Sequence, residues 1–181
     1  KENQENNSTQ AIFNDYDLLL KSIKNKELKV DLIVLATPSG LHPKQVISAA
    51  HLNINICTEK PMATSWDKGN QMVEACEKSG ASLFVVKQNR FNKTLKLLKK
   101  QIEKGRFGQI SMINSNVFWQ RPQNYYDQDK WRGTWEFDGG ALMNQASHYV
   151  DLLGWLGGPI ECVNASIATI GRRIEVEDTA A

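Results

Sequence analysis

Polar residues follow three short apolar segments in the first half of the chain, and they could act together on one ligand. The segments are 31–37, 53–57 and 82–86, and each is rich in β-branched residues. The polar residues that follow them are Thr37, Pro38 and His42, then Glu59 and Lys60, then Gln88 and Arg90. Ligands of open parallel sheets bind outside the carboxyl ends of the strands, although loops there are commonly polar whatever their function. A lysine at that edge could stabilise a negative charge that develops during a reaction.

Asn144 and His148 form a second candidate, because they are four residues apart in a segment with helical periodicity. This spacing predicts that both side chains lie on one face of a helix. Histidine titrates near neutral pH and could serve as a general base, but a lone helical histidine is more often structural. The preceding pair Gly139-Gly140 indicates that something approaches the backbone closely.

An aromatic segment precedes this helix and contains Arg132 and Thr134 between Trp131 and Trp135. A guanidinium binds carboxylates through two parallel hydrogen bonds, so the segment could hold a sugar or a carboxylate. The alternative is a packed aromatic loop with an arginine that faces solvent.

Helices and strands that alternate along the first half must position the first set of residues. The periodicity predicts helices over 15–27, 43–52 and 65–78, separated by the strands 31–37, 53–57 and 82–86. Pro43 suits a first helical turn, Ser65 or Thr64 suits an N-cap, and Gly80 suits a helix end. The alternation favours right-handed βαβ units and a parallel sheet. Residues 1–10 are wholly polar and are expected to form a solvated loop.

The pattern changes near Arg90. We expect a helix over 95–104, a strand over 110–120, an irregular aromatic stretch over 121–137, a helix over 141–156 and a strand over 160–170. The fold class is therefore α/β. A partial Rossmann-type parallel sheet in residues 1–90 is followed, in residues 91–181, by part of an α/β domain with an open, mainly antiparallel sheet.

Composition excludes several classes of protein. The 181 residues are 41% hydrophobic and 23% charged, and the net charge of +2 does not indicate a nucleic-acid surface. No segment is long and apolar enough for a membrane span or a signal peptide. The three cysteines suggest reduced thiols in a cytoplasmic protein, and the three histidines lack metal-ligand spacing, so we expect no metal.

These residues together resemble the glucose–fructose oxidoreductase/inositol dehydrogenase (Gfo/Idh/MocA) family. Glu59-Lys60-Pro61 after a strand, the Thr37-Pro38-x-x-x-His42 loop, and Gly139-Gly140 before Asn144 and His148 carry the resemblance. It implies a Rossmann domain that holds NAD(P), and a second domain that receives a sugar and forms a homo-oligomer, either a dimer or a tetramer. By position, Thr37, Pro38, His42, Glu59 and Lys60 would border the dinucleotide, with Gln88 and Arg90 nearby. Lys60 would also contact the substrate, and His148 would be the catalytic acid or base.

The chain departs from the family pattern in two ways. No Gly-x-Gly-x-x-Gly fingerprint follows a first strand, so we expect that fingerprint upstream of Lys1 and the end of the second domain beyond Ala181. NAD is thus implied by the resemblance, and the choice between NAD and NADP stays open. Many members carry aspartate where this chain has Asn144, and asparagine cannot ionise.

A narrower resemblance comes from Arg121-Pro-Gln-x-Tyr-Tyr-Asp, the Trp131–Trp135 segment and Asn144. They look like a subgroup that oxidises the 3-hydroxyl of UDP-N-acetylglucosaminuronic acid for bacterial surface polysaccharides. On this hypothesis Arg132, Thr134, Trp135 and Asn144 bind the sugar, together with Lys60 and His148. The alternatives are another sugar or inositol dehydrogenase of the family, or a non-catalytic protein that binds a dinucleotide or a sugar.

Overall fold

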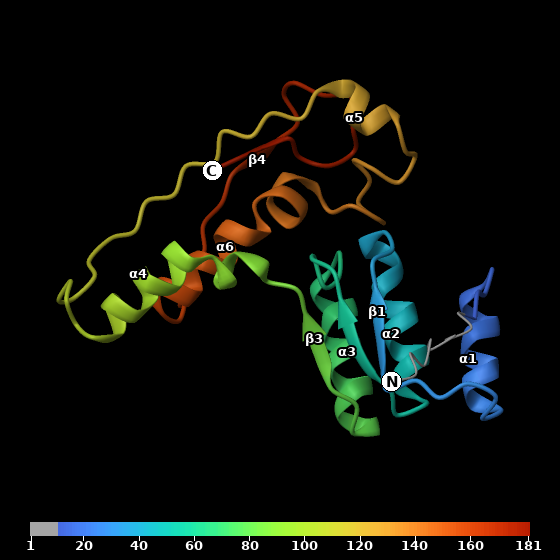
Figure 1. Ribbon diagram of the computed structural model, residues 1–181. Coiled ribbons are helices and arrows are strands. Elements are labelled where there is room, and N and C mark those ends of the chain that lie inside the picture. The colour runs from blue at the N-terminus through green and yellow to red at the C-terminus, as the bar shows by residue number, and fades with distance from the viewer. Residues whose placement is uncertain (1–10) are drawn as a thin grey trace, which may run out of the picture.

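The computed structural model describes residues 11–181; the predicted polar loop of residues 1–10 lies outside them. The first half contains the parallel sheet that the alternation predicts (Figure 1). In chain order its elements are α1 (Tyr16–Lys24), β1 (Leu32–Leu35), α2 (His42–Ala50), β2 (Asn55–Thr58), α3 (Trp66–Ser79) and β3 (Leu83–Val85). The strands lie in the order β1-β2-β3, with Val34 beside Cys57 and Cys57 beside Phe84. The partial Rossmann-type sheet is confirmed.

The helix ends follow from local chemistry. The Asp15 side chain accepts hydrogen bonds from the first turn of α1, and the Ser65 hydroxyl accepts one from Lys68 N at the start of α3. Pro43 occupies the first turn of α2, where its missing N–H is not needed. Gly80 ends α3 in the left-handed conformation, with φ of 77°.

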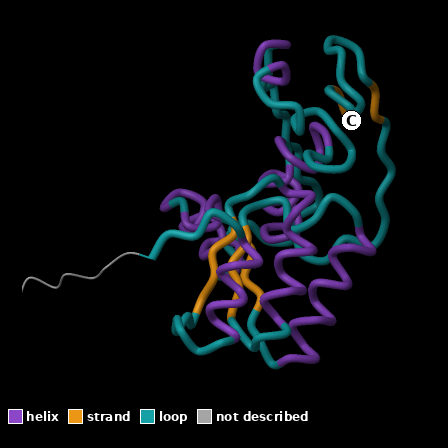
Figure 2. The backbone as a smooth tube through the Cα atoms, turned by 90° about the vertical axis from the view of Figure 1, so that its right-hand side faces the viewer, coloured by secondary structure: helices purple, strands orange, loops and turns teal. Residues whose placement is uncertain are grey.

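One face of the sheet carries the core. Ile33, Leu35 and Ile56 point from the strands into a buried cluster with Val46 of α2 and Met72 of α3. Alternate residues of the strands, such as Val34 and Phe84, point to the opposite face and are exposed. The tube view in Figure 2 shows the three strands lying beside the helices that cover them.

The second half is built from helices and long irregular segments. Its elements are η2 (Gln88–Phe91), α4 (Lys93–Glu103), α5 (Gln123–Asp127), a π-helical turn η3 (Ala141–Gln145), α6 (Ser147–Gly157), β4 (Ile167–Ala168) and β5 (Thr179–Ala180). Strands β4 and β5 pair in antiparallel fashion. Figure 1 shows α4 beside α6, and the yellow chain between α4 and α5 running without a neighbouring strand.

Two strand predictions in this half were wrong, one entirely and one in its extent. Residues 110–120 form no strand, and of residues 160–170 only Ile167 and Ala168 are paired. A strand needs a neighbour for its N–H and C=O groups, and the described residues place none beside 110–120. Met112 and Phe118 in this stretch are accordingly exposed.

The predicted helix over 141–156 consists of two segments. The π-helical turn η3 precedes α6, and Ala146 N bonds back to Ala141 O at 2.8 Å, five residues earlier. Such π-turns occur frequently at functional sites. Among residues 11–181, no helix is long and apolar enough to cross a membrane.

Candidate active site

Lys60 and Asn144 meet at the carboxyl edge of the parallel sheet. Lys60 lies just beyond the end of β2, and its Nζ donates to the backbone oxygen of Asn144 at 2.9 Å and to Asn144 Oδ1 at 2.8 Å. Burial lowers the pKa of Lys60 from its ordinary value, while the charges of Glu59 and Asp138 raise it. The ammonium is thus fixed in place by two oxygen acceptors.

Asp138 completes this contact, and sequence reasoning did not single it out. Its side chain is only 2% exposed; Oδ1 accepts from Asn144 Nδ2, and Oδ2 accepts from Gly133 N at 2.6 Å. The sequence signal for Asp138 is its position directly before Gly139-Gly140.

His148 lies close to the Lys60 contact, at the start of α6. It is 8% exposed, its Nε2 is 3.4 Å from Gln88 Nε2, and its Nδ1 is buried without a partner among the described residues. Burial, followed by the charges of Lys60 and Lys87, lowers the pKa of His148 from its ordinary value. A lowered pKa favours the neutral imidazole, which is the form that can accept a proton.

Asn144 and His148 do not share one continuous helical face. Asn144 belongs to η3 and His148 to α6, and the two segments meet at Ala146. Both side chains are nevertheless buried beside the sheet edge, Asn144 against Lys60 and His148 against Gln88. The π-turn produces an arrangement that the simple spacing rule does not describe.

Arg90 is bound by a carboxylate. Its Nε and Nη2 donate to the two oxygens of Asp151 at 2.7 and 2.6 Å, and Lys87 Nζ lies 3.9 Å from the same carboxylate. This contact joins η2 to α6 and holds the helix of His148 against the sheet half. Asp151 is a second residue that sequence reasoning missed.

His42 connects two loops at the sheet edge. It is fully buried, with Nε2 3.0 Å from Thr37 O and Nδ1 3.1 Å from Pro61 O. Thr37 Oγ1 in turn donates to Gln45 Oε1 at 2.6 Å. Both ring nitrogens of His42 thus face protein oxygens, and its predicted contact with a dinucleotide stays a prediction. Pro38 and Glu59 lie in the same two loops, and Glu59 Oε2 accepts from Lys60 N at 3.3 Å.

A buried glutamate supports the start of the helical segment that carries Asn144. Glu177 is 5% exposed; its backbone oxygen accepts from Ala141 N at 3.0 Å, and Oε1 accepts from Leu142 N at 2.9 Å. Gly140, at φ of 78°, packs against this carboxylate, and a Cβ there would lie 2.0 Å from Glu177 Oε2. The close approach expected at Gly139-Gly140 is therefore with Glu177.

Among the described residues, the hydrogen bonds between the aromatic segment and the site come from the backbone of the segment. Arg132 Nε donates to Asp129 at 2.8 Å, Thr134 Oγ1 donates to Trp131 O at 2.7 Å, and Trp135 is exposed. None of these side chains forms a hydrogen bond with Lys60 or His148 in the described part of the chain. The hydrogen bond that links the segment to the site is donated by Gly133 N to the carboxylate of Asp138.

Arg121 differs from Arg132 in its ion pairing. Its guanidinium lies over Trp119 at 4.3 Å and over Tyr125 at 5.1 Å, and its Nε is buried without a hydrogen-bond partner among residues 11–181. Within residues 11–181 no carboxylate forms an ion pair with it. Its charge also lowers the pKa of Lys60, so the guanidinium acts on the site electrostatically.

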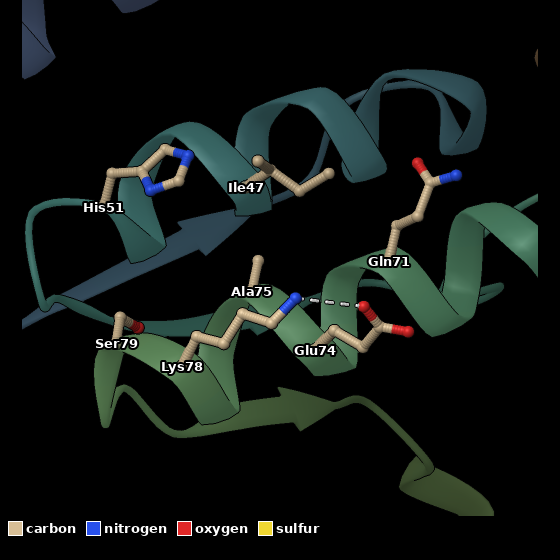
Figure 3. Close-up of a pocket in the computed structure, with 7 residues that line it drawn as sticks. All are labelled: Ile47, His51, Gln71, Glu74, Ala75, Lys78 and Ser79. Carbon is tan, nitrogen blue, oxygen red and sulfur yellow. Dashed lines mark hydrogen bonds and ion pairs between the residues drawn. The ribbon is translucent and has the colours of Figure 1, made fainter.

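Neither of two cavities contains the candidate site. One, of about 470 Å³, lies between α2 and α3 and is lined by Ile47, His51, Gln71, Glu74, Ala75, Lys78 and Ser79 (Figure 3). His51 and Ser79 mark the C-terminal ends of the two helices, so this cavity faces away from the carboxyl edge of the strands. The other cavity has a volume of about 330 Å³, is lined mainly by apolar side chains and lies beside α4.

Within the described chain, no group of three or more His, Cys, Asp or Glu side chains is placed to hold a metal.

Two solved structures are similar to this chain over most of its length. The WlbA dehydrogenase from Bordetella pertussis, solved with NADH and UDP-GlcNAcA, is 58% identical with a TM-score of 0.87. The WlbA dehydrogenase from Chromobacterium violaceum, also with NADH and UDP-GlcNAcA, is 53% identical with a TM-score of 0.83. The alignments cover 93% and 92% of this chain but only 47% and 52% of those chains. The chain thus spans about half the length of these relatives.

Family models and a curated relative agree with this similarity. The curated scyllo-inositol 2-dehydrogenase (NADP(+)) IolW of Bacillus subtilis is 26% identical over 82% of this chain and 41% of its own length. Residues 2–87 match the oxidoreductase family model with an NAD-binding Rossmann fold, and residues 95–181 match the Gfo/Idh/MocA C-terminal domain. The chain therefore belongs to the Gfo/Idh/MocA oxidoreductase family.

Proposed function

We propose that this chain is part of an NAD-dependent dehydrogenase that oxidises the 3-hydroxyl of UDP-N-acetylglucosaminuronic acid. The observation that carries the proposal is the contact of Lys60 Nζ with Asn144, together with the buried imidazole of His148 beside Gln88 at the same edge of the sheet. An acceptor for a proton and a fixed cation are what the oxidation of an alcohol requires. The two WlbA structures, solved with NADH and UDP-GlcNAcA, supply the choice of substrate and cofactor.

The residues at the sheet edge fit a nicotinamide cofactor. Dinucleotides bind at the carboxyl ends of parallel strands, which is where Lys60 and the Thr37 loop lie. His148 Nδ1 and Thr58 Oγ1 are buried near this edge without hydrogen-bond partners in the described residues, so the described protein groups alone do not satisfy every polar atom there. When bound, NAD supplies the nicotinamide ring that accepts a hydride from the sugar.

In the proposed mechanism, this chain moves the proton and stabilises charge. His148 accepts the proton of the sugar hydroxyl, which its lowered pKa allows near neutral pH. Lys60 donates a hydrogen bond to the oxygen that becomes negative as the proton leaves. Asn144 holds Lys60 and donates no charge of its own. Thr37, Pro38, His42, Glu59 and Gln88 stay proposed neighbours of the dinucleotide, with Arg90 placed by Asp151.

The uronate carboxylate needs a cation. Arg132, with Thr134 and Trp135, is the group proposed from the sequence, but its guanidinium already contacts Asp129. Arg121 is stacked on aromatic rings, and no carboxylate is paired with it in the described chain, so a substrate carboxylate would be its first anionic partner. The structure thus offers two arginines whose roles an experiment can separate.

We propose a boundary near Arg90 between a dinucleotide-binding part and a substrate-binding part. We also propose a homo-oligomer formed through the second part, in the cytoplasm. Size-exclusion chromatography with light scattering of the full-length protein measures the oligomeric state directly.

The activity is tested with purified full-length protein, NAD and a panel of substrates. We expect NADH to form with UDP-N-acetylglucosaminuronic acid and not with myo-inositol, scyllo-inositol or free hexoses. Turnover of a cyclitol instead would favour the second candidate, an inositol dehydrogenase, which the similarity to IolW suggests. Cofactor binding without turnover of any sugar would favour a non-catalytic binding protein.

A further inference from the structure

The carboxylate of Asp138 lies behind the contact between Lys60 and Asn144. Asp138 Oδ1 accepts a hydrogen bond from Asn144 Nδ2, and Asn144 Oδ1 accepts from Lys60 Nζ at 2.8 Å. We propose that Asp138 is a positioning residue that turns the oxygen of Asn144 towards Lys60 and keeps Lys60 in its charged form. The effect on turnover rests on the proposed function, but the effect on Lys60 does not.

The amide side chain of Asn144 has two chemically different ends. Asn144 carries an acceptor oxygen and a donor nitrogen of nearly equal size, while an ionised carboxylate can only accept. Asp138 therefore binds the nitrogen end and leaves the oxygen end for Lys60. With Asp138 removed, the amide could rotate, and its N–H groups would then face the Lys60 ammonium, donor against donor.

Asp138 is itself held firmly. Its Oδ2 accepts from Gly133 N at 2.6 Å, and its backbone N donates to Thr134 O at 3.0 Å. It is only 2% exposed, and in the described chain no cation forms an ion pair with it. A buried carboxylate is stable when hydrogen bonds satisfy it, and these come from Gly133 and Asn144.

The charge of Asp138 acts on Lys60 across Asn144. Burial lowers the pKa of the Lys60 amine, and the charges of Arg121 and Lys87 lower it further, while the carboxylates of Glu59 and then Asp138 oppose that effect. A neutral amine could not stabilise an alkoxide, so the carboxylate extends the pH range in which Lys60 is a cation. This effect is separate from the orientation of the amide and can be measured without substrate.

The first experiment measures the charge of Lys60 directly in substrate-free, full-length protein. Acetic anhydride labels only the neutral amine, and mass spectrometry follows the labelling of Lys60 as a function of pH. We expect the midpoint for Asp138→Asn at lower pH than for the wild type. The matched control is Asp127→Asn, which removes an exposed aspartate of α5 and should leave the midpoint unchanged. An Asp138→Asn midpoint equal to that of the wild type would overturn the proposal.

The second experiment exchanges the two side chains. In Asp138→Asn combined with Asn144→Asp, the new amide can accept from Gly133 N and donate to the new carboxylate, which still accepts from Lys60. All the hydrogen bonds are retained, so this variant should fold even if Asp138→Asn does not. We expect its labelling midpoint to be at least as high as that of the wild type. A midpoint below the wild type would contradict the proposal.

Turnover gives the last readout. If the proposed dehydrogenase activity is present, Asp138→Asn should lower kcat by about 10- to 100-fold, because a misplaced catalytic group loses rate on this scale. The exchange variant should recover most of that loss, and unchanged kcat in Asp138→Asn would count against the proposal. If the wild type turns over no sugar, the proposed function fails, and the labelling experiment still decides the role of Asp138.

Discussion

Lys60 Nζ donates to both the backbone oxygen and Oδ1 of Asn144, at 2.9 and 2.8 Å, although 84 residues separate them in the chain. One residue follows a strand of the parallel sheet, and the other belongs to the π-turn before α6. The contact fixes the cation of one half of the chain against the helical segment of the other. A charge fixed in advance stabilises a transition state at little cost in reorganisation.

Replacing Lys60 should remove the proposed charge stabilisation. Lys60→Met in the full-length protein keeps most of the side-chain volume and removes the ammonium. We expect kcat with UDP-N-acetylglucosaminuronic acid to fall by about 100- to 1,000-fold, the usual effect of losing one such donor. Initial rates of NADH formation give the value. The control is Lys44→Met, which replaces an exposed lysine of α2 and should keep wild-type turnover. Wild-type turnover in Lys60→Met would rule out the role assigned to Lys60.

The pH dependence of kcat/KM should be bell-shaped. His148 acts when neutral, and its pKa is lowered from 6.5, so activity rises with pH through a midpoint below 6.5. Lys60 acts when charged, and its pKa is lowered from 10.5, so activity falls with pH through a midpoint below 10.5. Rates of oxidation between these limits should form a plateau. If the acidic limb of the pH profile is unchanged in the His148→Gln variant, a group other than His148 produces that limb.

Much of the first half could be predicted from the sequence, because each element has a local cause. Asp15, Ser65 and Gly80 define helix ends through hydrogen bonds and backbone conformation, which depend on neighbouring residues only. The residues after strands follow from topology, since all parallel strands end at one edge. Lys60 was found by this rule, and the structure places it there.

The partners of these residues could not be predicted from local rules. Asp138 and Asp151 act through contacts with Asn144 and Arg90, and no spacing in the sequence indicates either contact. Residues 110–120 have strand-like sequence, but pairing depends on a neighbouring strand, which the described residues do not supply. Glu177 likewise accepts hydrogen bonds from Ala141 N and Leu142 N at the start of η3, and no local rule indicates this contact between distant residues.

Two arginine variants should separate the candidates for the uronate carboxylate. If Arg121 binds it, Arg121→Ala should raise KM for the UDP-uronate by about 10-fold or more, the effect of losing one charged hydrogen bond. Arg132→Ala should then have a smaller effect, because Asp129 already pairs with that guanidinium. Steady-state kinetics with UDP-N-acetylglucosamine, which lacks the carboxylate, gives the control. The reverse order of the two variants would assign the role to Arg132.

Gly140 should tolerate no side chain. It adopts φ of 78°, and a Cβ there would lie 2.0 Å from Glu177 Oε2, inside the contact that holds the first turn of η3. Gly140→Ala should therefore destabilise the protein by about 2–3 kcal/mol, from backbone strain together with displacement of the buried carboxylate. Urea denaturation followed by circular dichroism measures the change in the free energy of unfolding.

The matched control is Gly108→Ala. Gly108 also has positive φ, at 65°, but a Cβ there would meet nothing within 4 Å. This variant should show only the backbone penalty of about 1 kcal/mol. The difference between the two variants therefore reports the clash with Glu177 together with the added strain at Gly140, whose ψ of -174° lies in a region that only glycine adopts readily. Because the clash displaces the helical segment of Asn144 and His148, Gly140→Ala should also lose turnover at temperatures where it remains folded. Equal stability of the two variants would show that Glu177 can move aside without cost.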